Sequence, residues 1–91
     1  MYDLRIEKRV LSELRRYPPK IYKQVMGCVL ALQFNPRPHD CKRIGLGYRV
    51  DSGEYRIFYL VDDEEQRVTV PLIGQRSDDE IYRLARRLGL L

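Results

Sequence analysis

A β-hairpin signal near the middle of the chain most constrains its fold. Residues 48–51 and 54–61 are rich in aromatic and β-branched side chains, and they flank Ser52-Gly53, a two-residue loop with glycine second. Side chains alternate between the two faces of a strand. The hairpin is therefore predicted to have one apolar face, made by Tyr48, Val50, Tyr55, Ile57, Tyr59 and Val61.

The same loop predicts which charged residues lie across from one another on the other face. It places Asp51 opposite Glu54 and Arg49 opposite Arg56. Like charges directly opposite each other destabilise a sheet, so an interaction with a group outside the hairpin is expected to offset this repulsion. Two interpretations stay open: the arginine side chains splay into solvent, or their planar guanidinium groups hold an anion such as phosphate.

A third strand and a helix are predicted after the hairpin. The strand covers residues 66–73, and one of its faces is made by Val68, Val70 and Leu72. Pro71 lacks an N–H, which indicates a strand at a sheet edge or one paired there on one side only. Ser77 followed three residues later by Glu80 is a capping box. The helix that it starts has core spacing at Ile81, Leu84, Ala85 and Leu88.

The first part of the chain predicts a strand and two helices. Apolar and charged residues alternate over residues 2–7, as in a strand, and the period then becomes helical over residues 8–16. Pro18-Pro19 ends that helix. The apolar stripe of the first helix is Val10, Leu11 and Leu14. A longer helix beginning at Ile21 has the stripe Ile21, Val25, Cys28, Val29 and Leu32.

These elements predict a single α+β domain spanning residues 1–91, in the order β-α-α-β-β-β-α. Two helices joined by a short turn form an antiparallel hairpin that can cover one face of a sheet. We therefore expect a mostly antiparallel four-stranded sheet with the N-terminal helical hairpin packed on one face and a helix at the C-terminus. Residues 39–47 are expected to be a loop or an irregular entry to the next strand.

Charge is distributed unevenly along the chain. Residues 1–47 hold ten Lys and Arg against four Asp and Glu, whereas residues 48–91 hold seven against nine. A basic first half favours a polyanionic partner such as RNA or DNA, although basic helical faces are often merely solvated. No apolar run is long enough for a membrane helix and no signal-peptide pattern is present, so a cytoplasmic protein with no membrane partner is expected.

Metal and thiol chemistry are not expected. Cys28 and Cys41 lack the spacing of metal ligands and are interpreted as ordinary thiols. His39 is the only histidine and is interpreted as a surface residue. The sequence therefore predicts no metal and no cofactor.

Taken together, these residues resemble the RelE/ParE superfamily, the toxins of type II toxin–antitoxin pairs. The resemblance covers essentially the whole chain and implies a small RelE-like fold. RelE-like members cut messenger RNA in the ribosomal A site, whereas ParE-like members poison DNA gyrase. The features that carry the resemblance are Tyr48-Arg49, Gly53-Glu54-Tyr55-Arg56-Ile57-Phe58-Tyr59, Ile73-Gly74-Gln75-Arg76 and Tyr82.

Resemblance to the RelE-like branch, which we favour, implies a catalytic role for three residues. Arg56 would bind the scissile phosphate and stabilise the transition state. Arg76 would assist as a cationic partner or leaving-group acid, and Tyr82 would act as the general base.

The implied RNA-binding residues include one departure from the family. Arg49 matches one of the two basic positions on the strand before Arg56, but Asp51 stands at the second. Basic residues supplied by Lys42 or Arg43 could compensate for that carboxylate.

The chemistry can be argued without the resemblance. Metal-independent RNA cleavage needs a base for the 2′-OH, cations for the phosphorane and a proton for the 5′-oxygen. A tyrosine with a pKa of about 10 is a poor base at neutral pH, but nearby guanidinium groups favour its phenolate. Each residue also has a structural alternative: Arg56 could pair with Glu54, Arg76 with an aspartate at the helix start, and Tyr82 could cover the helix end.

The leading hypothesis is a ribosome-dependent mRNA endoribonuclease that cleaves through attack of the 2′-OH. The alternatives are a ParE-like gyrase poison and a catalytically weak member that mainly binds a partner. The resemblance implies neutralisation by a cognate antitoxin, contacts with the ribosome and messenger RNA, and, together with the antitoxin, binding to operator DNA.

Overall fold

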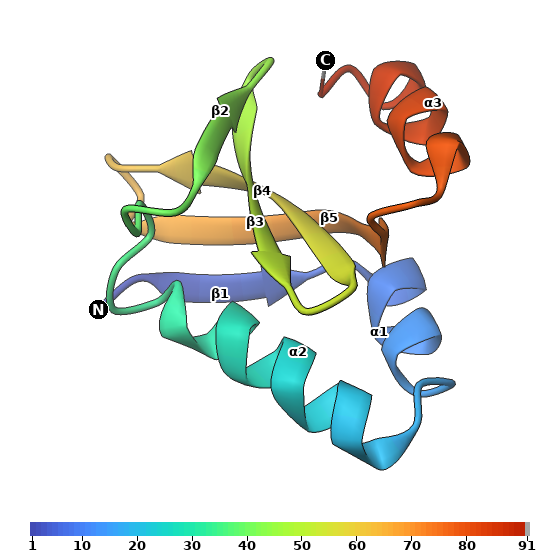
Figure 1. Ribbon diagram of the computed structural model, residues 1–91. Coiled ribbons are helices and arrows are strands. Elements are labelled where there is room, and N and C mark those ends of the chain that lie inside the picture. Colours follow the sequence, from blue (N-terminus) through green and yellow to red (C-terminus); the bar gives the residue numbers. More distant parts are fainter. Residues whose placement is uncertain (91) are drawn as a thin grey trace.

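A single sheet forms the framework of residues 1–90, the part of the chain that the computed structural model describes (Figure 1). Within this part there are five strands and three helices. Their order along the chain is β1 (Asp3–Ile6), α1 (Lys8–Leu14), α2 (Pro19–Ala31), β2 (Lys42–Ile44), β3 (Gly47–Ser52), β4 (Tyr55–Asp62), β5 (Arg67–Gln75) and α3 (Asp79–Arg87).

The strands lie in the order β1-β5-β4-β3-β2, and only β1 and β5 are parallel. The predicted α+β class, the mostly antiparallel sheet and the order of its main elements are confirmed. The predicted number of four strands is wrong, because residues 42–44 form the short edge strand β2 where a loop or strand entry was expected. Three residues are too few to show the alternation by which a strand is predicted.

The predicted register of the β3–β4 hairpin is wrong, although its faces are correct. Ser52 pairs with Tyr55, so the two loop residues are Gly53 and Glu54 rather than Ser52 and Gly53. Gly53 has a φ of 59°, which favours glycine at the first position of such a loop. Each residue of β3 pairs with a residue of β4 two positions further along than predicted. Because side chains alternate between faces with a period of two, every side chain keeps its predicted face.

A β-bulge explains why the third predicted strand does not keep one face throughout. Phe58 pairs with Leu72 and Leu60 with Thr69, so one residue of β4 faces two of β5. Val68 and Val70 lie in one core, but Leu72 lies in the other, contrary to the prediction. Pro71 occupies the bulge of an interior strand.

The edge position considered for the strand of Pro71 is also wrong, since β5 lies between β1 and β4. The parallel pairing with β1 nevertheless ends at Val70, so the missing N–H of Pro71 interrupts no bond to that neighbour.

Helices lie on both sides of the sheet (Figure 1), and the buried residues within residues 1–90 form one apolar core on each face. Helices α1 and α2 cover the larger one, as the sequence predicts for the N-terminal helical hairpin. Helix α3 covers the smaller one. The buried residues of the larger core are Val10, Leu14, Val25, Val29, Leu32, Val50, Ile57, Tyr59, Val68, Val70 and Ile73. Those of the smaller core are Phe58, Leu72, Ile81, Ala85 and Leu90.

The ends of α3 differ from the prediction. The N-cap is Asp78, whose Oδ1 accepts from the backbone N–H of Glu80 at 3.0 Å, so the predicted capping box is wrong. Leu88 is 38 % exposed, and Leu90 is buried in its place because the chain reverses at Gly89, with a φ of 78°. Leu11 in α1, predicted to belong to the apolar stripe, is likewise 36 % exposed. None of the helices within residues 1–90 is long and apolar enough to cross a membrane.

Candidate active site

The true hairpin register brings Asp51 of β3 directly opposite Arg56 of β4. The Nε of Arg56 donates to Asp51 Oδ1 at 2.8 Å, and its Nη2 donates to Oδ2 at 3.3 Å. This is a bidentate pair, and the Arg56 side chain is only 13 % exposed. The expected opposition of Arg49 and Arg56 is therefore wrong, and with it the cross-strand repulsion. The partner of Arg56 is Asp51, not Glu54.

The remaining edge of the Arg56 guanidinium faces Tyr82 of α3. Its Nη1 donates to the Tyr82 hydroxyl, and the guanidinium carbon lies 5.8 Å from the centre of the tyrosine ring. The ring packs edge-on against Phe58, with 5.9 Å between ring centres. Phe58 is buried two residues after Arg56 on the same face of β4. Strand β4 therefore positions both the cation and the aromatic contact that hold Tyr82.

Two further arginines converge on the same carboxylate. Arg76, just after β5, lies with its Nε 3.5 Å from Asp51 Oδ2, and Arg49 of β3 with its Nη1 3.8 Å from Oδ1. The backbone N–H of Arg76 donates to the carbonyl of Glu54 at 2.8 Å, which ties the exit of β5 to the hairpin loop. The structure thus brings together Arg49, Arg56, Arg76 and Tyr82, all of them candidates from the sequence.

We call Arg49, Arg56 and Arg76 the arginine cradle. Its three guanidinium groups surround the single carboxylate of Asp51. Hydrogen bonding from Arg56 is the main cause that holds the pKa of Asp51 below its ordinary value, and the positive charges of Arg56, Arg76 and Arg49 add to it. One carboxylate neutralises one of three cations. The cradle keeps a surplus of positive charge that can attract an anion.

The two basic candidates of β2 lie on different faces of the sheet. Lys42 pairs with Arg49, so it shares the face of the arginine cradle, whereas Arg43 pairs with Tyr48 and shares the opposite one. Arg43 donates to the Tyr48 hydroxyl at 3.2 Å, and its guanidinium lies 5.2 Å from the centre of that ring. Lys42 can therefore extend the cradle, and Arg43 cannot.

A second polar cluster, around Tyr48 on the opposite face, was not predicted from the sequence. Arg37 donates to the Tyr48 hydroxyl at 2.9 Å and forms a bidentate pair with Asp63, with N···O distances of 3.1 and 2.8 Å. Hydrogen bonds from Arg37 and Arg43 lower the pKa of Tyr48. Asp63 also accepts from Tyr2. No short-range pattern joins these residues, because they come from four separate segments.

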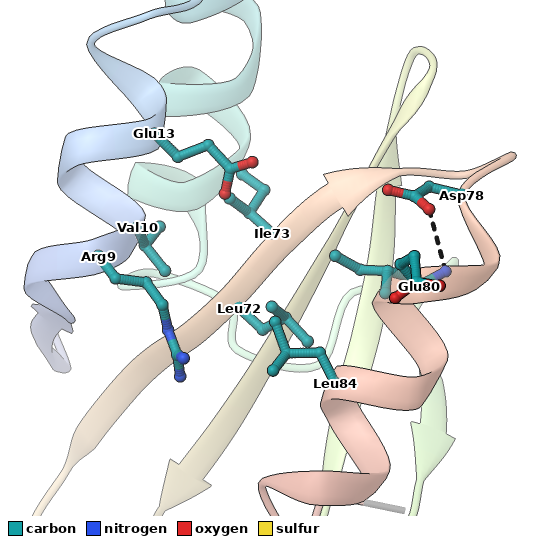
Figure 2. Close-up of a pocket in the computed structure, with 9 residues that line it drawn as sticks. Arg9, Val10, Glu13, Leu72, Ile73, Asp78, Glu80 and Leu84 are labelled. Atoms are coloured by element: carbon teal, nitrogen blue, oxygen red, sulfur yellow. Dashed lines mark hydrogen bonds between the residues drawn. The ribbon is translucent and has the colours of Figure 1, made fainter.

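A cavity of about 160 Å³ lies between α1 and α3 over β5, and none of the cradle residues lines it (Figure 2). Leu72 and Leu84 form part of its apolar wall, and Glu13 and Asp78 lie at its margin. Burial raises the pKa of the Glu13 carboxyl, and the charge of Asp78 adds to this effect. No cluster of His, Cys, Asp and Glu that could hold a metal ion occurs within residues 1–90.

No family model matches the sequence. The chain is 31 % identical over 82 residues to RelE1, a candidate toxin of Methanocaldococcus jannaschii, and the match covers 84 % of this chain and 91 % of that protein. Among solved structures, a free mutant of the E. coli toxin RelE superposes with a TM-score of 0.77 at 26 % identity, over 96 % of each chain. A chain of the intact E. coli RelBE toxin–antitoxin complex superposes with a TM-score of 0.71 at 26 % identity, covering 86 % of this chain and 100 % of that one.

Proposed function

This chain belongs to the RelE family of toxins, and on that premise we propose that it is the toxin of a type II toxin–antitoxin pair and cleaves messenger RNA on the ribosome. One observation carries the enzymatic part of the proposal. Arg56 of the sheet is hydrogen-bonded to the hydroxyl of Tyr82 on α3, with Arg76 and Arg49 beside it.

The arginines supply the charge that metal-free phosphodiester cleavage needs. Attack of a ribose 2′-OH gives a phosphorane with extra negative charge, and preorganised donors stabilise such a charge most strongly in a partly desolvated site. Arg56 is the most buried of the three arginines and is fixed by both of its neighbours. Arg76, which is 48 % exposed and lies 3.5 Å from Asp51, would follow the leaving 5′-oxygen. It acts as a cationic partner rather than an acid, because a guanidinium does not release its proton in proteins. Water therefore supplies the proton to the 5′-oxygen as its bond to phosphorus breaks, which leaves a 2′,3′-cyclic phosphate.

Tyr82 is the proposed general base. Its hydroxyl oxygen already accepts an N–H from Arg56, so negative charge that develops on this oxygen has a cationic donor in place. The edge-on contact with Phe58 fixes the ring, which limits the directions from which the 2′-OH can approach. The phenol and the arginines then act on the same nucleotide.

The partners in this proposal are a cognate antitoxin, the ribosome with its messenger RNA and, for the toxin–antitoxin pair, operator DNA. The E. coli protein with the same fold occurs in a complex with its antitoxin, which supports the first of these. The basic surplus of residues 1–47 supports contacts with ribosomal RNA.

The deciding experiment is primer extension on a defined messenger RNA in a translation extract, with and without ribosomes. We expect cleavage only with ribosomes, and its loss in Arg56→Ala and Tyr82→Phe. Arg83→Ala is the matched control, because Arg83 follows Tyr82 on α3 but is exposed and pairs with Glu80 at the surface. Full cleavage by Tyr82→Phe would contradict the role of the phenol. Inhibition of gyrase supercoiling without any RNA cleavage would contradict the whole proposal.

A further inference from the structure

The carboxylate of Asp51 occupies N–H donors of the arginine cradle that the proposed function assigns to an RNA phosphate. Two of its contacts form a bidentate fork with Arg56, and two longer ones reach Arg76 and Arg49 at 3.5 and 3.8 Å. A planar guanidinium presents the same pair of N–H groups to a carboxylate as to a phosphate. The two anions therefore compete for one set of donors.

Each of the three guanidinium nitrogens of Arg56 already donates one hydrogen bond to a neighbour. Its Nη1 donates to Tyr82, while its Nε and Nη2 donate to Asp51. The side chain is 13 % exposed, so little of it is accessible to a second anion. A phosphate that enters beside Asp51 also places two negative charges close together, which is unfavourable at such short range.

We infer that Asp51 is an internal competitor for the RNA phosphate, which must displace the carboxylate from Arg56 before the three arginines can close around it. This inference rests on the proposed function, because it assumes that the cradle receives a phosphodiester. Asp51 thereby lowers the affinity of the free protein for RNA. Productive binding is confined to substrates that other contacts hold in place, such as a messenger RNA fixed by the ribosome.

The opposite role for Asp51 makes the opposite prediction. If the carboxylate served only to orient Arg56 toward Tyr82, its removal would loosen the guanidinium and weaken RNA binding. Comparing affinities with and without the carboxylate therefore separates competition from positioning.

The test measures binding of a fluorescein-labelled, fully 2′-O-methylated RNA oligonucleotide by fluorescence anisotropy at fixed salt. This RNA cannot be cleaved, because every 2′-OH is blocked. We expect Asp51→Asn to bind at least about tenfold more tightly than the wild type, while Asp51→Glu, which keeps the charge, stays within about twofold of it.

Asp63→Asn is the matched control for net charge. Asp63 is held by Arg37 in a bidentate pair on the opposite face of the sheet, so its removal adds the same single positive charge and also frees one arginine. We expect this variant to gain less than about twofold in affinity. Equal gains in RNA affinity for the two variants would show that net charge alone explains the tighter binding, and this would overturn the inference. Weaker binding by Asp51→Asn than by the wild type would also overturn it.

A variant without Arg56 tests whether the gain in RNA affinity arises in the arginine cradle. The uncleavable probe makes this test independent of the proposed cleavage. In an Arg56→Ala background, Asp51→Asn should give no gain in affinity, and a retained tenfold gain would overturn the inference. Asp51→Ser serves in the same assays if the asparagine variant does not fold. Because the probe is uncleavable, tighter binding by Asp51→Asn stands even if primer extension shows no cleavage. A protein that cleaves normally but shows no gain refutes the competitor role alone.

Discussion

Arg56 is the residue that joins the sheet to the last helix in the candidate active site. One edge of its guanidinium binds Asp51 of β3, and the other donates to the hydroxyl of Tyr82. These contacts need the fork of N–H groups as well as the charge. A lysine keeps the charge, but it cannot donate to Tyr82 while it also presents a pair of N–H groups to Asp51 or to the phosphate that displaces it.

We therefore expect Arg56→Lys to lower the rate of ribosome-dependent RNA cleavage by on the order of 10²-fold or more, as loss of a preorganised donor commonly does. The rate is measured at saturating enzyme on ribosomes stalled at one codon. The thermal midpoint of unfolding serves as the control for folding. A lysine variant with the wild-type rate would show that charge alone suffices.

The pKa of Asp51 makes a prediction about acid stability. The arginine cradle lowers this pKa in the folded protein, so the contribution of Asp51 to stability is present above the unfolded-state pKa of about 4 and is lost as pH falls through the folded value. Urea unfolding followed from pH 6 to pH 2 should therefore show a smaller acid-dependent loss of stability in Asp51→Asn than in the wild type. Parallel curves for the two proteins would contradict this linkage.

At the scale of elements, the seating of α3 on the sheet depends on Gly74. A Cβ added at Gly74 would clash with Cδ1 of Ile81 and lie 2.9 Å from its Cγ1. Gly74 pairs with Arg56, so this contact lies beside the arginine cradle. The missing side chain of Gly74 lets α3 approach closely enough for Tyr82 to reach Arg56.

Gly74→Ala is expected to destabilise the protein by about 1–3 kcal/mol through overpacking and to reduce cleavage by displacing Tyr82. The double variant Gly74→Ala/Ile81→Ala should be less destabilised than the sum of its single variants, because the second change removes the clash. Both free energies come from urea unfolding. Strict additivity would show that the two residues are not coupled.

The start of α3 gives a second prediction at this scale. Asp78 caps the helix through the N–H of Glu80, whereas the described residues 1–90 show no side-chain hydrogen bond from Ser77 to the start of α3. Asp78→Ala should cost about 1 kcal/mol in the free energy of unfolding, and Ser77→Ala less than about 0.5 kcal/mol. The reverse order in urea unfolding would favour the capping box that the sequence alone suggested.

What the sequence predicted well were the elements with strong periodicity. Helix α2 and strand β4 carry long apolar patterns, and packing of those patterns forms the larger core. The errors arose where one or two residues decide the geometry. Gly53 takes the first loop position instead of the second, and Pro71 sits in a bulge that moves Leu72 to the other core. Such details depend on backbone twist and neighbouring strands, which local pattern does not contain.

The same limit applies to the candidate site. Arg56, Arg76 and Tyr82 were selected through the motif, and the structure brings them together. The contact between Asp51 and Arg56 was missed, because it depends on the register of the hairpin. The cluster of Arg37, Tyr48 and Asp63 is made by residues far apart in the chain and left no local signal.

For the molecule as a whole, the two cores are unequal. Among residues 1–90, eleven buried residues form the core under α1 and α2, whereas five form the core under α3. The cavity of Figure 2 lies between α3 and α1. Stability is therefore unevenly distributed, and α3, which carries Tyr82, is held on the sheet by the smaller core.

We expect native-state hydrogen exchange to show α3 opening in a local step. Its amides should exchange at least about tenfold faster than those of β4 and β5, a difference of about 1.4 kcal/mol in opening free energy. Exchange followed by mass spectrometry or NMR at several urea concentrations measures this directly. Equal opening energies for α3 and the central strands would mean that the two cores unfold as one unit.

The parallel pairing of β1 with β5 has a consequence for how the protein is made. Asp3 of the first strand meets Arg67, so the N-terminal strand stays without its neighbour until the ribosome has produced most of the polypeptide. Arg76 and Tyr82 emerge later still. A partly synthesised copy accordingly lacks both the β1–β5 pairing and the complete set of proposed catalytic groups, so the proposed cleavage of messenger RNA can begin only after Tyr82 has been synthesised and β5 has paired with β1.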